Sequence, residues 1–225
     1  MIRTAGFPWI ASDRIARKWV VLGTGGHARV VLSALAGTGI EVMGAVGPLP
    51  PPGKQPTLPI LGDDEWLLSQ GADDYFVING VGANPDIAIR RALFKRYRSR
   101  GFRFPPMAHP QAMIANGVMI GEAVQVMMGA IVQEGTSLGE NAVINTGAIV
   151  EHDVQVGSHV FIAPGATVCG GVEIGTSAFL GAGCVVLPGL SIGPGAVVAA
   201  GAILTHPISA GEKVAGCPAR PINVR

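Results

Sequence analysis

From Ile114 to Leu204 an aliphatic residue recurs at every sixth position without interruption. Four residues after each of them comes a second apolar or small residue, such as Val118 or Ala130. A period of six drifts against the 3.6 residues of a helical turn, so these sixteen hexads do not fit an α-helix. The pattern predicts a solenoid of short strands and tight turns. Three hexads would form one triangular coil, giving about five coils with the aliphatic residues stacked inside.

The residues before the repeat alternate instead between strand and helix patterns. The expected elements are strands at residues 20–22, 42–46 and 75–79, a glycine turn at 23–26, and helices at 27–35, 63–69 and 87–98. The proline-rich segment 47–59 is expected to be a loop. The chain is therefore predicted to divide into a βαβαβ, Rossmann-like unit over residues 1–106 and a β-helix with a C-terminal tail over residues 107–225.

Composition narrows the class of protein. Charged residues make up 14% of the 225, and the formal net charge is +1. The chain is too apolar for a disordered protein, and its charge gives no general attraction to nucleic acid or to a membrane surface. No run approaches 18 apolar residues, and the N-terminal residues lack the apolar core of a secretory signal. Three cysteines without metal-type spacing indicate reduced thiols in a cytoplasmic protein.

Basic residues are distributed unevenly along the chain. Residues 90–103 hold seven of them, which we interpret as a solvated helix face, with anion contact as the alternative. Between Arg103 and Lys213 there is no lysine or arginine. An anionic ligand on the β-helix would therefore be bound by backbone amides, or by Lys213, Arg220 and Arg225.

Two short segments carry candidate chemistry. The glycine turn at 23–26 leads into a helix, whose free backbone N–H groups suit a phosphate, although such a turn can also be purely structural. In mid-repeat, Glu151, His152 and Asp153 stand side by side in an otherwise apolar stretch. They are either a solvated corner or a histidine base with a carboxylate beside it, and imidazole titrates near neutral pH as a base requires.

Several motifs together resemble one family. They are GTGGHARVV, NTGAIVEHD, IAPGATVCGGVEIG, GAGCVVLPG and VAGCPARPI, spread from about Trp19 to the end of the chain. The chain resembles the hexapeptide-repeat sugar acyltransferases of the sialic acid O-acetyltransferase type. The best understood members N-acetylate nucleotide-linked 4-amino-4,6-dideoxy sugars with acetyl-CoA. The resemblance implies an α/β nucleotide-binding-like unit followed by a left-handed parallel β-helix, and a cytoplasmic homotrimer with active sites between subunits.

The resemblance also implies roles for individual residues. His152 matches the general base, and Asp153 the carboxylate that fixes its tautomer. Glu151 is the competing partner, but adjacent strand residues tend to point apart, which favours Asp153. The positions implied for acetyl-CoA are Gly170, Ala182, Ala200 and Phe161, with Lys213 and Arg220 inferred for its phosphates; those implied for the nucleotide sugar are Gly25, Gly26, His27, Gly82 and Asn84. No metal is expected.

The chain departs from the family pattern at two places. Many relatives carry a second histidine nine residues after the base, where this chain has Phe161, with His159 two residues earlier. Relatives also usually carry acidic residues after the second strand, where this chain has Gly47 and Pro48. The first departure concerns one acetyl-CoA contact. The second leaves the identity of the nucleotide open.

Other functions compete with this interpretation. O-acetylation of a sialic acid or another free sugar uses the same chemistry, and a non-catalytic binding or scaffold role would make the three polar residues a corner. A zinc enzyme like the carbonic anhydrases built on this fold would need His152, His159 and His206 to converge on the metal. A serine O-acetyltransferase is disfavoured because those enzymes carry a helical N-terminal domain.

Overall fold

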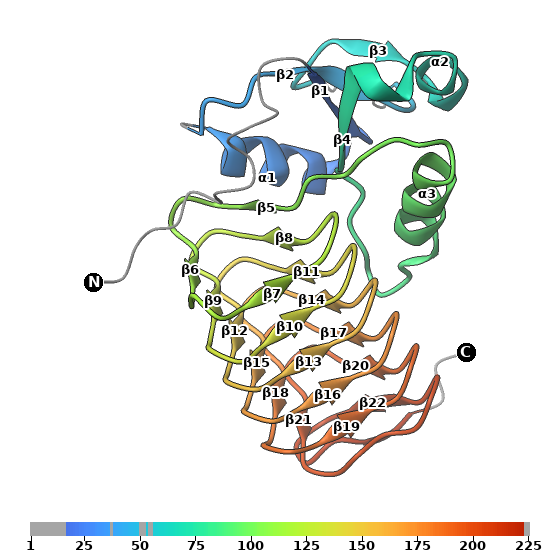
Figure 1. The fold of residues 1–225 in the computed structure, drawn as a ribbon. Coiled ribbons are helices and arrows are strands. Elements are labelled where there is room, and N and C mark those ends of the chain that lie inside the picture. The colour runs from blue at the N-terminus through green and yellow to red at the C-terminus, as the bar shows by residue number, and fades with distance from the viewer. Residues whose placement is uncertain (1–16, 37, 50–52, 54–55, 223–225) are drawn as a thin grey trace. The chain divides into compact units, whose positions relative to one another are not determined.

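A computed structural model describes residues 17–36, 38–49, 53 and 56–222 (Figure 1). The chain divides into two compact units, with the boundary between Pro105 and Pro106. The first contains a parallel sheet with helices, and the second is built from stacked two-residue strands. The fold class predicted from the sequence, an α/β unit followed by a parallel β-helix, is confirmed.

The N-terminal unit is a four-stranded parallel sheet in the order β3-β2-β1-β4. Its elements are β1 (Lys18–Leu22), α1 (Gly26–Leu35), β2 (Val42–Val46), β3 (Ile60–Gly62), α2 (Asp64–Leu68), a 3-10 turn (Ala72–Asp74), β4 (Tyr75–Asn79) and α3 (Ala88–Arg98). All five residues of β4 are buried, although β4 is an edge strand of this sheet. Phe94 and Tyr97 of α3 are also buried.

Most of these elements agree with the sequence pattern, and β3 is the exception. β2 and β4 begin and end as expected, and α1 begins one residue earlier, at Gly26. β3 follows the proline-rich segment and has only three residues, too few to show the alternation by which strands are recognised. It nevertheless places the residues that follow it at the carboxyl edge of the sheet, beside the glycine turn.

The C-terminal unit contains three sheets of short strands. The six-stranded sheet holds β6 (Met113–Ile114), β9 (Ile131–Val132), β12 (Ile149–Val150), β15 (Thr167–Val168), β18 (Val185–Val186) and β21 (Ile203–Leu204). The five-stranded sheet holds β7 (Met119–Ile120), β10 (Ser137–Leu138), β13 (Gln155–Val156), β16 (Glu173–Ile174) and β19 (Ser191–Ile192). The eight-stranded sheet holds β5 (Met107–Ala108), β8 (Gln125–Val126), β11 (Val143–Ile144), β14 (Phe161–Ile162), β17 (Phe179–Leu180), β20 (Val197–Val198), β22 (Lys213–Ala215) and the antiparallel β23 (Arg220–Pro221).

Within the regular repeat each strand pairs in parallel with the strand eighteen residues further along. Ile149 pairs with Thr167, and Val150 with Val168. The second residue of each strand points into the prism, where Val150 and Val168 are fully buried, while the first points outward. The inner aliphatic series predicted from the sequence therefore forms the core of the β-helix.

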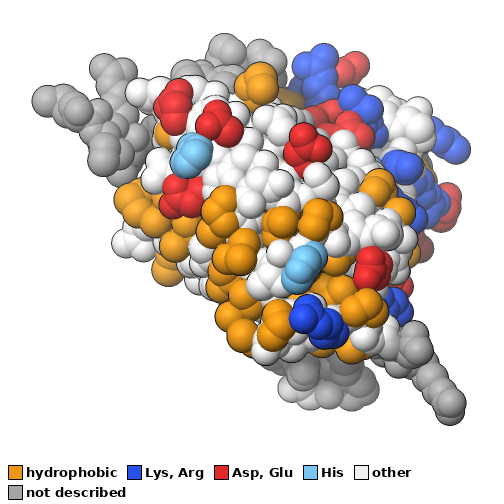
Figure 2. Space-filling model, turned by 90° about the horizontal axis from the view of Figure 1, so that it is seen from below, with side chains coloured by type: hydrophobic (Ala, Val, Ile, Leu, Met, Phe, Trp, Pro, Cys, Tyr) orange, Lys and Arg blue, Asp and Glu red, His pale blue; other side chains and the backbone are white. Residues whose placement is uncertain are grey.

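Turns join the three sheets along three edges of the prism. We call the turns from the six-stranded to the five-stranded sheet, such as 151–154 and 169–172, the histidine edge. Those from the eight-stranded to the six-stranded sheet, such as 181–184 and 199–202, form the alanine edge. Figure 2 shows that hydrophobic side chains cover much of the surface of the β-helix when it is seen from below.

Candidate active site

His152 and Asp153 form a hydrogen-bonded pair at the middle of the histidine edge. His152 Nδ1 lies 2.9 Å from Asp153 Oδ2, and both side chains are largely accessible, at 66% and 72%. Asp153 has φ +59°, a left-handed conformation that aspartate tolerates better than most residues. An ionised carboxylate only accepts hydrogen bonds, so in this pair Nδ1 carries the proton and Nε2 is the basic nitrogen.

The two neighbouring coils contact this turn directly. In the preceding coil, the fully buried Thr136 donates its hydroxyl to the carbonyl of Glu151 (2.8 Å) and accepts from the N–H of Val154 (3.2 Å). In the following coil, Gly170 lies against the imidazole ring. A Cβ at Gly170 would stand 2.6 Å from both Nε2 and Cε1 of His152.

The positions implied for acetyl-CoA fall in different parts of the β-helix. Gly170 lies on the histidine edge, whereas Ala182 and Ala200 are exposed on the alanine edge. The outward face of the six-stranded sheet separates these two edges within one chain. Lys213 in β22 and Arg220 in β23 are both exposed near the C-terminal end of the solenoid.

His159 lies in the turn 157–160, on the third edge, which joins the five-stranded to the eight-stranded sheet, and Phe161 begins β14 directly after it. Phe161 is buried and stacks on Phe179, with ring centroids 5.7 Å apart and an interplanar angle of 11°. His159 is also buried, and its Nδ1 lies 3.1 Å from Nδ2 of Asn141. Within one chain these rings lie on a different edge from His152.

The N-terminal unit contains an open groove of about 1280 Å³ at the carboxyl edge of its sheet. The residues implied for the nucleotide sugar all line it: Gly25, Gly26, His27, Gly82 and Asn84. A Cβ at Gly82 would be 3.2 Å from Cβ of His27, so the two segments meet closely. Helix α1 begins here without a side-chain cap, which leaves its first N–H groups available to an anion.

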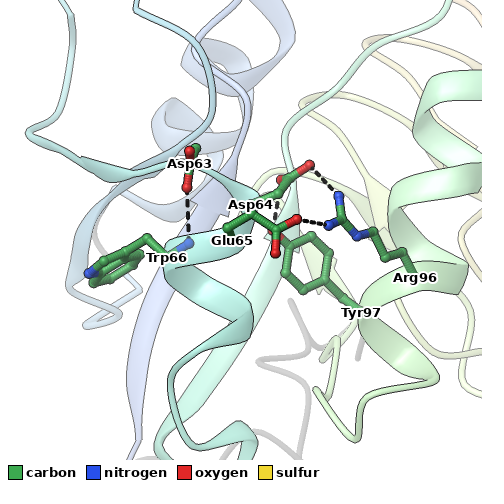
Figure 3. Close-up of polar contacts among 6 residues, drawn as sticks. All are labelled: Asp63, Asp64, Glu65, Trp66, Arg96 and Tyr97. Carbon is green, nitrogen blue, oxygen red and sulfur yellow. Dashed lines mark hydrogen bonds and ion pairs between the residues drawn. The ribbon is translucent and has the colours of Figure 1, made fainter.

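Acidic residues also reach this groove, although not from the expected strand. Asp63, Asp64 and Glu65 follow β3 and line the groove together with Gly47 and Pro48. Figure 3 shows that Asp63 accepts from the N–H of Trp66 (2.9 Å), while Asp64 and Glu65 both pair with Arg96.

Arg96 is the one lysine or arginine among the described residues that line the groove, and its charge is already balanced. Tyr97 also donates to Asp64, at 2.7 Å (Figure 3). Burial and this hydrogen bond raise the pKa of Tyr97, so its hydroxyl stays a donor. A phosphate in the groove would therefore depend mainly on backbone N–H groups. The place of this acidic cluster in the groove was not predicted, because it depends on β3, which is too short to be recognised from its sequence pattern.

The described part of the chain can also be searched for a metal site and for a membrane-spanning helix. Among those residues, no three histidine, cysteine, aspartate or glutamate side chains come together as metal ligands would. His152 lies on the histidine edge and His159 on the third edge, while Nδ1 of His206 contacts Oγ1 of Thr205 at 2.8 Å. In the same described residues, no helix has the length and apolar character needed to cross a bilayer.

The cysteines differ sharply in exposure, which gives a testable order of reactivity. Cys184 is buried in the prism, and burial raises the pKa of its thiol to about 12; Cys217 is exposed and Cys169 is intermediate. We expect iodoacetamide at pH 8 to modify Cys217 first and Cys184 only after unfolding, because alkylation requires an accessible thiolate. Peptide mass spectrometry measures this order. Equal labelling of Cys184 and Cys217 in the native protein would contradict it.

Family models match both units of the chain. The PglD N-terminal domain matches residues 18–97. The bacterial transferase hexapeptide (six repeats) matches residues 135–170, and the hexapeptide repeat of succinyl-transferase matches residues 153–188 and 171–206. No curated protein sequence matches the chain.

Solved structures match almost the whole chain. The acetyltransferase domain of PglB from Neisseria gonorrhoeae is 32% identical, with a TM-score of 0.83, and the match covers 92% of this chain and 100% of that domain. Its complex with acetyl coenzyme A matches with a TM-score of 0.84 over 92% and 99% of the two chains. PerB from Caulobacter crescentus, in complex with CoA and GDP-perosamine, is 32% identical with a TM-score of 0.83, over 92% and 97%.

Proposed function

Because the chain belongs to the family of hexapeptide-repeat sugar acyltransferases, we propose that it transfers an acetyl group from acetyl-CoA to the amino group of a nucleotide-linked 4-amino-4,6-dideoxy sugar. The observation that carries this proposal is the His152–Asp153 pair on an exposed edge of the β-helix. The relatives support it, since PglB is described with acetyl coenzyme A and PerB with CoA and GDP-perosamine.

In this proposal His152 is the general base. The sugar amine attacks the thioester carbonyl, the C–N bond forms, and Nε2 of His152 takes the proton that the amine loses. Asp153 accepts from Nδ1–H and stabilises the imidazolium that results. The C–S bond then breaks, and CoA leaves as a thiolate that regains the proton. No acyl-enzyme forms in this route, so none of the cysteines needs to act as a nucleophile.

Gly170 is the proposed donor to the thioester oxygen. Its N–H makes no hydrogen bond to a carbonyl within the described chain, and the residue lies against the ring of His152. A backbone N–H beside the base suits the negative charge that develops on the attacked carbonyl. Ala182 and Ala200 would let the pantetheine approach the backbone, and Lys213 and Arg220 would contact the CoA phosphates. Phe161 is also proposed as an acetyl-CoA position, because it stands where many relatives carry the second histidine.

We further propose a homotrimer with active sites between subunits. The histidine edge and the alanine edge are separate within one chain, so a neighbouring copy is needed to bring Gly170 near Ala182 and Ala200. The outward residues of the six-stranded sheet support this arrangement, because they are nearly all apolar and yet remain exposed or only partly buried in a single chain: Met113, Ile131, Ile149, Thr167, Val185 and Ile203.

The nucleotide sugar is assigned to the groove of the N-terminal unit, residues 1–106, and acetyl transfer to the β-helix, residues 107–225. The uncapped start of α1, with Gly25, Gly26 and His27, would bind the diphosphate, and Gly82 and Asn84 would bound the same space. Asp63 in the groove offers a carboxylate that can accept from ribose or base.

The experiment is thiol release from acetyl-CoA with UDP-, dTDP- and GDP-linked 4-amino-4,6-dideoxy sugars, followed by mass spectrometry of the product. We expect acetylation of at least one of them and none of its 4-hydroxy counterpart, because the proposed nucleophile is the amine. The matched hydroxyl sugars and free sialic acid are the controls.

Each other outcome changes the assignment in a defined way. Acetylation of free sialic acid or of sugar hydroxyls alone would replace the proposal with sugar O-acetylation. If no sugar reacts and acetyl-CoA does not raise the melting temperature, the chain is a binding or scaffold protein rather than an enzyme.

A further inference from the structure

Thr136 occupies a position in the β-helix where no polar residue is needed for packing. It faces into the prism, at the site that other hexads fill with an apolar residue such as Val124, Ala142 or Val160. A buried hydroxyl costs free energy unless it is hydrogen-bonded, and valine has nearly the same shape. The presence of threonine therefore needs a reason other than filling the core.

The reason lies in the turn that carries the base. On the alanine edge, in turns such as 145–148 and 163–166, the fourth N–H donates directly to the first carbonyl, at 3.0 and 3.3 Å, whereas the described histidine-edge turns 151–154 and 169–172 lack this bond. In the turn 151–154 the hydroxyl of Thr136 bridges these two groups instead, donating to Glu151 and accepting from Val154. The preceding coil thus fixes both ends of the segment that presents His152.

Gly170 is unusual in its own row of turn residues. At the second position of the other turns on the histidine edge the chain has Asn116, Glu134, His152 and Pro188, so the backbone there accepts side chains. Gly170 is not among the residues with positive φ, and its conformation does not require glycine. The close neighbour is the ring of His152, which a Cβ at Gly170 would meet at 2.6 Å.

We propose that Thr136 and Gly170 are positioning residues for His152, one coil before it and one coil after it. Thr136 sets the backbone of the turn, and the missing side chain at Gly170 leaves room for the ring to lie with Nδ1 on Asp153. The catalytic consequence rests on the proposed function. The orientation of the ring does not, and it can be measured without a substrate.

For Thr136 the test compares Thr136→Val, which removes the hydroxyl at constant shape, with Thr136→Ser, which keeps it. We expect Thr136→Val to lower kcat about tenfold or more with little change in either KM, because a small displacement of a base is costly, and Thr136→Ser to restore most of kcat. A Thr136→Val enzyme with wild-type kcat, whatever its melting temperature, would overturn the role of Thr136.

For Gly170 the test is a double-mutant cycle with His152. Gly170→Ala should lower kcat about 10²-fold in the wild type, and should change the residual kcat by less than about threefold in a His152→Ala background, where no ring is displaced. An equal loss of acetyl-CoA affinity in both backgrounds would overturn the positioning role and leave Gly170 as a cofactor contact.

A substrate-free readout separates this inference from the proposed function. The ¹⁵N chemical shifts of the His152 ring report which nitrogen carries the proton. We expect Nδ1–H in the wild type and Thr136→Ser, and a mixture of tautomers in Thr136→Val and Gly170→Ala. Unchanged ring shifts in both variants would refute the inference even in an active enzyme, whereas altered shifts in an inactive chain would support it and reject only the activity.

Discussion

Replacing His152 by alanine is expected to lower kcat roughly 10²- to 10⁴-fold while the β-helix stays folded. The side chain is 66% accessible, so its removal leaves no cavity in the core. What is lost is the nitrogen that we propose as the base, beside Gly170, whose N–H donates to no carbonyl among the described residues. Steady-state kinetics with a reactive nucleotide sugar, together with the melting temperature, would separate chemistry from folding.

Two further variants sharpen this test. Asp153→Asn should lower kcat by about tenfold or more, because an amide cannot stabilise the imidazolium as a carboxylate does. His206→Ala is the matched control, since His206 is also exposed with its Nδ1 hydrogen-bonded to a neighbouring side chain, in this case Thr205. Activity that survives in His152→Ala, or is lost equally in His206→Ala, would reduce the Glu151-His152-Asp153 segment to a polar corner.

Ile149→Asp is expected to dissociate the proposed trimer and remove most of the activity with it. Ile149 is the outward residue of β12, in the apolar row of the six-stranded sheet. An unpaired carboxylate buried between subunits would cost several kcal/mol. Light scattering should show single chains of 23.0 kDa in place of three, and kcat/KM should fall about 10²-fold because the two edges no longer meet.

Ser191→Asp is the control for the interface. Ser191 is the outward residue of β19, in the five-stranded sheet, whose outward residues are mostly polar, and it is exposed. The same charge placed there should leave both mass and activity within about threefold of the wild type. If Ile149→Asp behaves like Ser191→Asp, another surface joins the subunits. A wild type that is monomeric and active would exclude sites between subunits altogether.

Most of the β-helix could be predicted from the sequence, because each short strand needs its own inward aliphatic residue. The series from Ile114 to Leu204 follows the strands from β6 to β21 without a gap. The same reasoning failed at β3, since three residues give no period to read. The position of Asp63, Asp64 and Glu65 in the groove was therefore not predicted either, because it depends on where β3 pairs in the sheet.

Part of the candidate site could also be predicted from the sequence. Neighbours in sequence, such as His152 and Asp153, could be paired directly from the motif. The contacts of Thr136 with the turn 151–154, and of Gly170 with the ring of His152, could not be predicted. They run between coils, over fifteen to eighteen residues, and become visible only when the register is known. A threonine in an apolar inner row and a glycine where other turns carry side chains were the available signals.

The eighteen-residue coil also governs which changes in chain length this protein can tolerate. Removing or adding eighteen residues away from residues 133–172 would return every later turn to the edge it already occupies. Removing six would rotate every later turn by one edge. Such a deletion between Thr136 and His152 would therefore separate the base from Thr136 while leaving each strand an inward aliphatic residue. The number of residues inserted or deleted therefore acts like a reading frame for this solenoid. Two chains of equal hydrophobicity and nearly equal length can differ in whether the active-site residues come together at all.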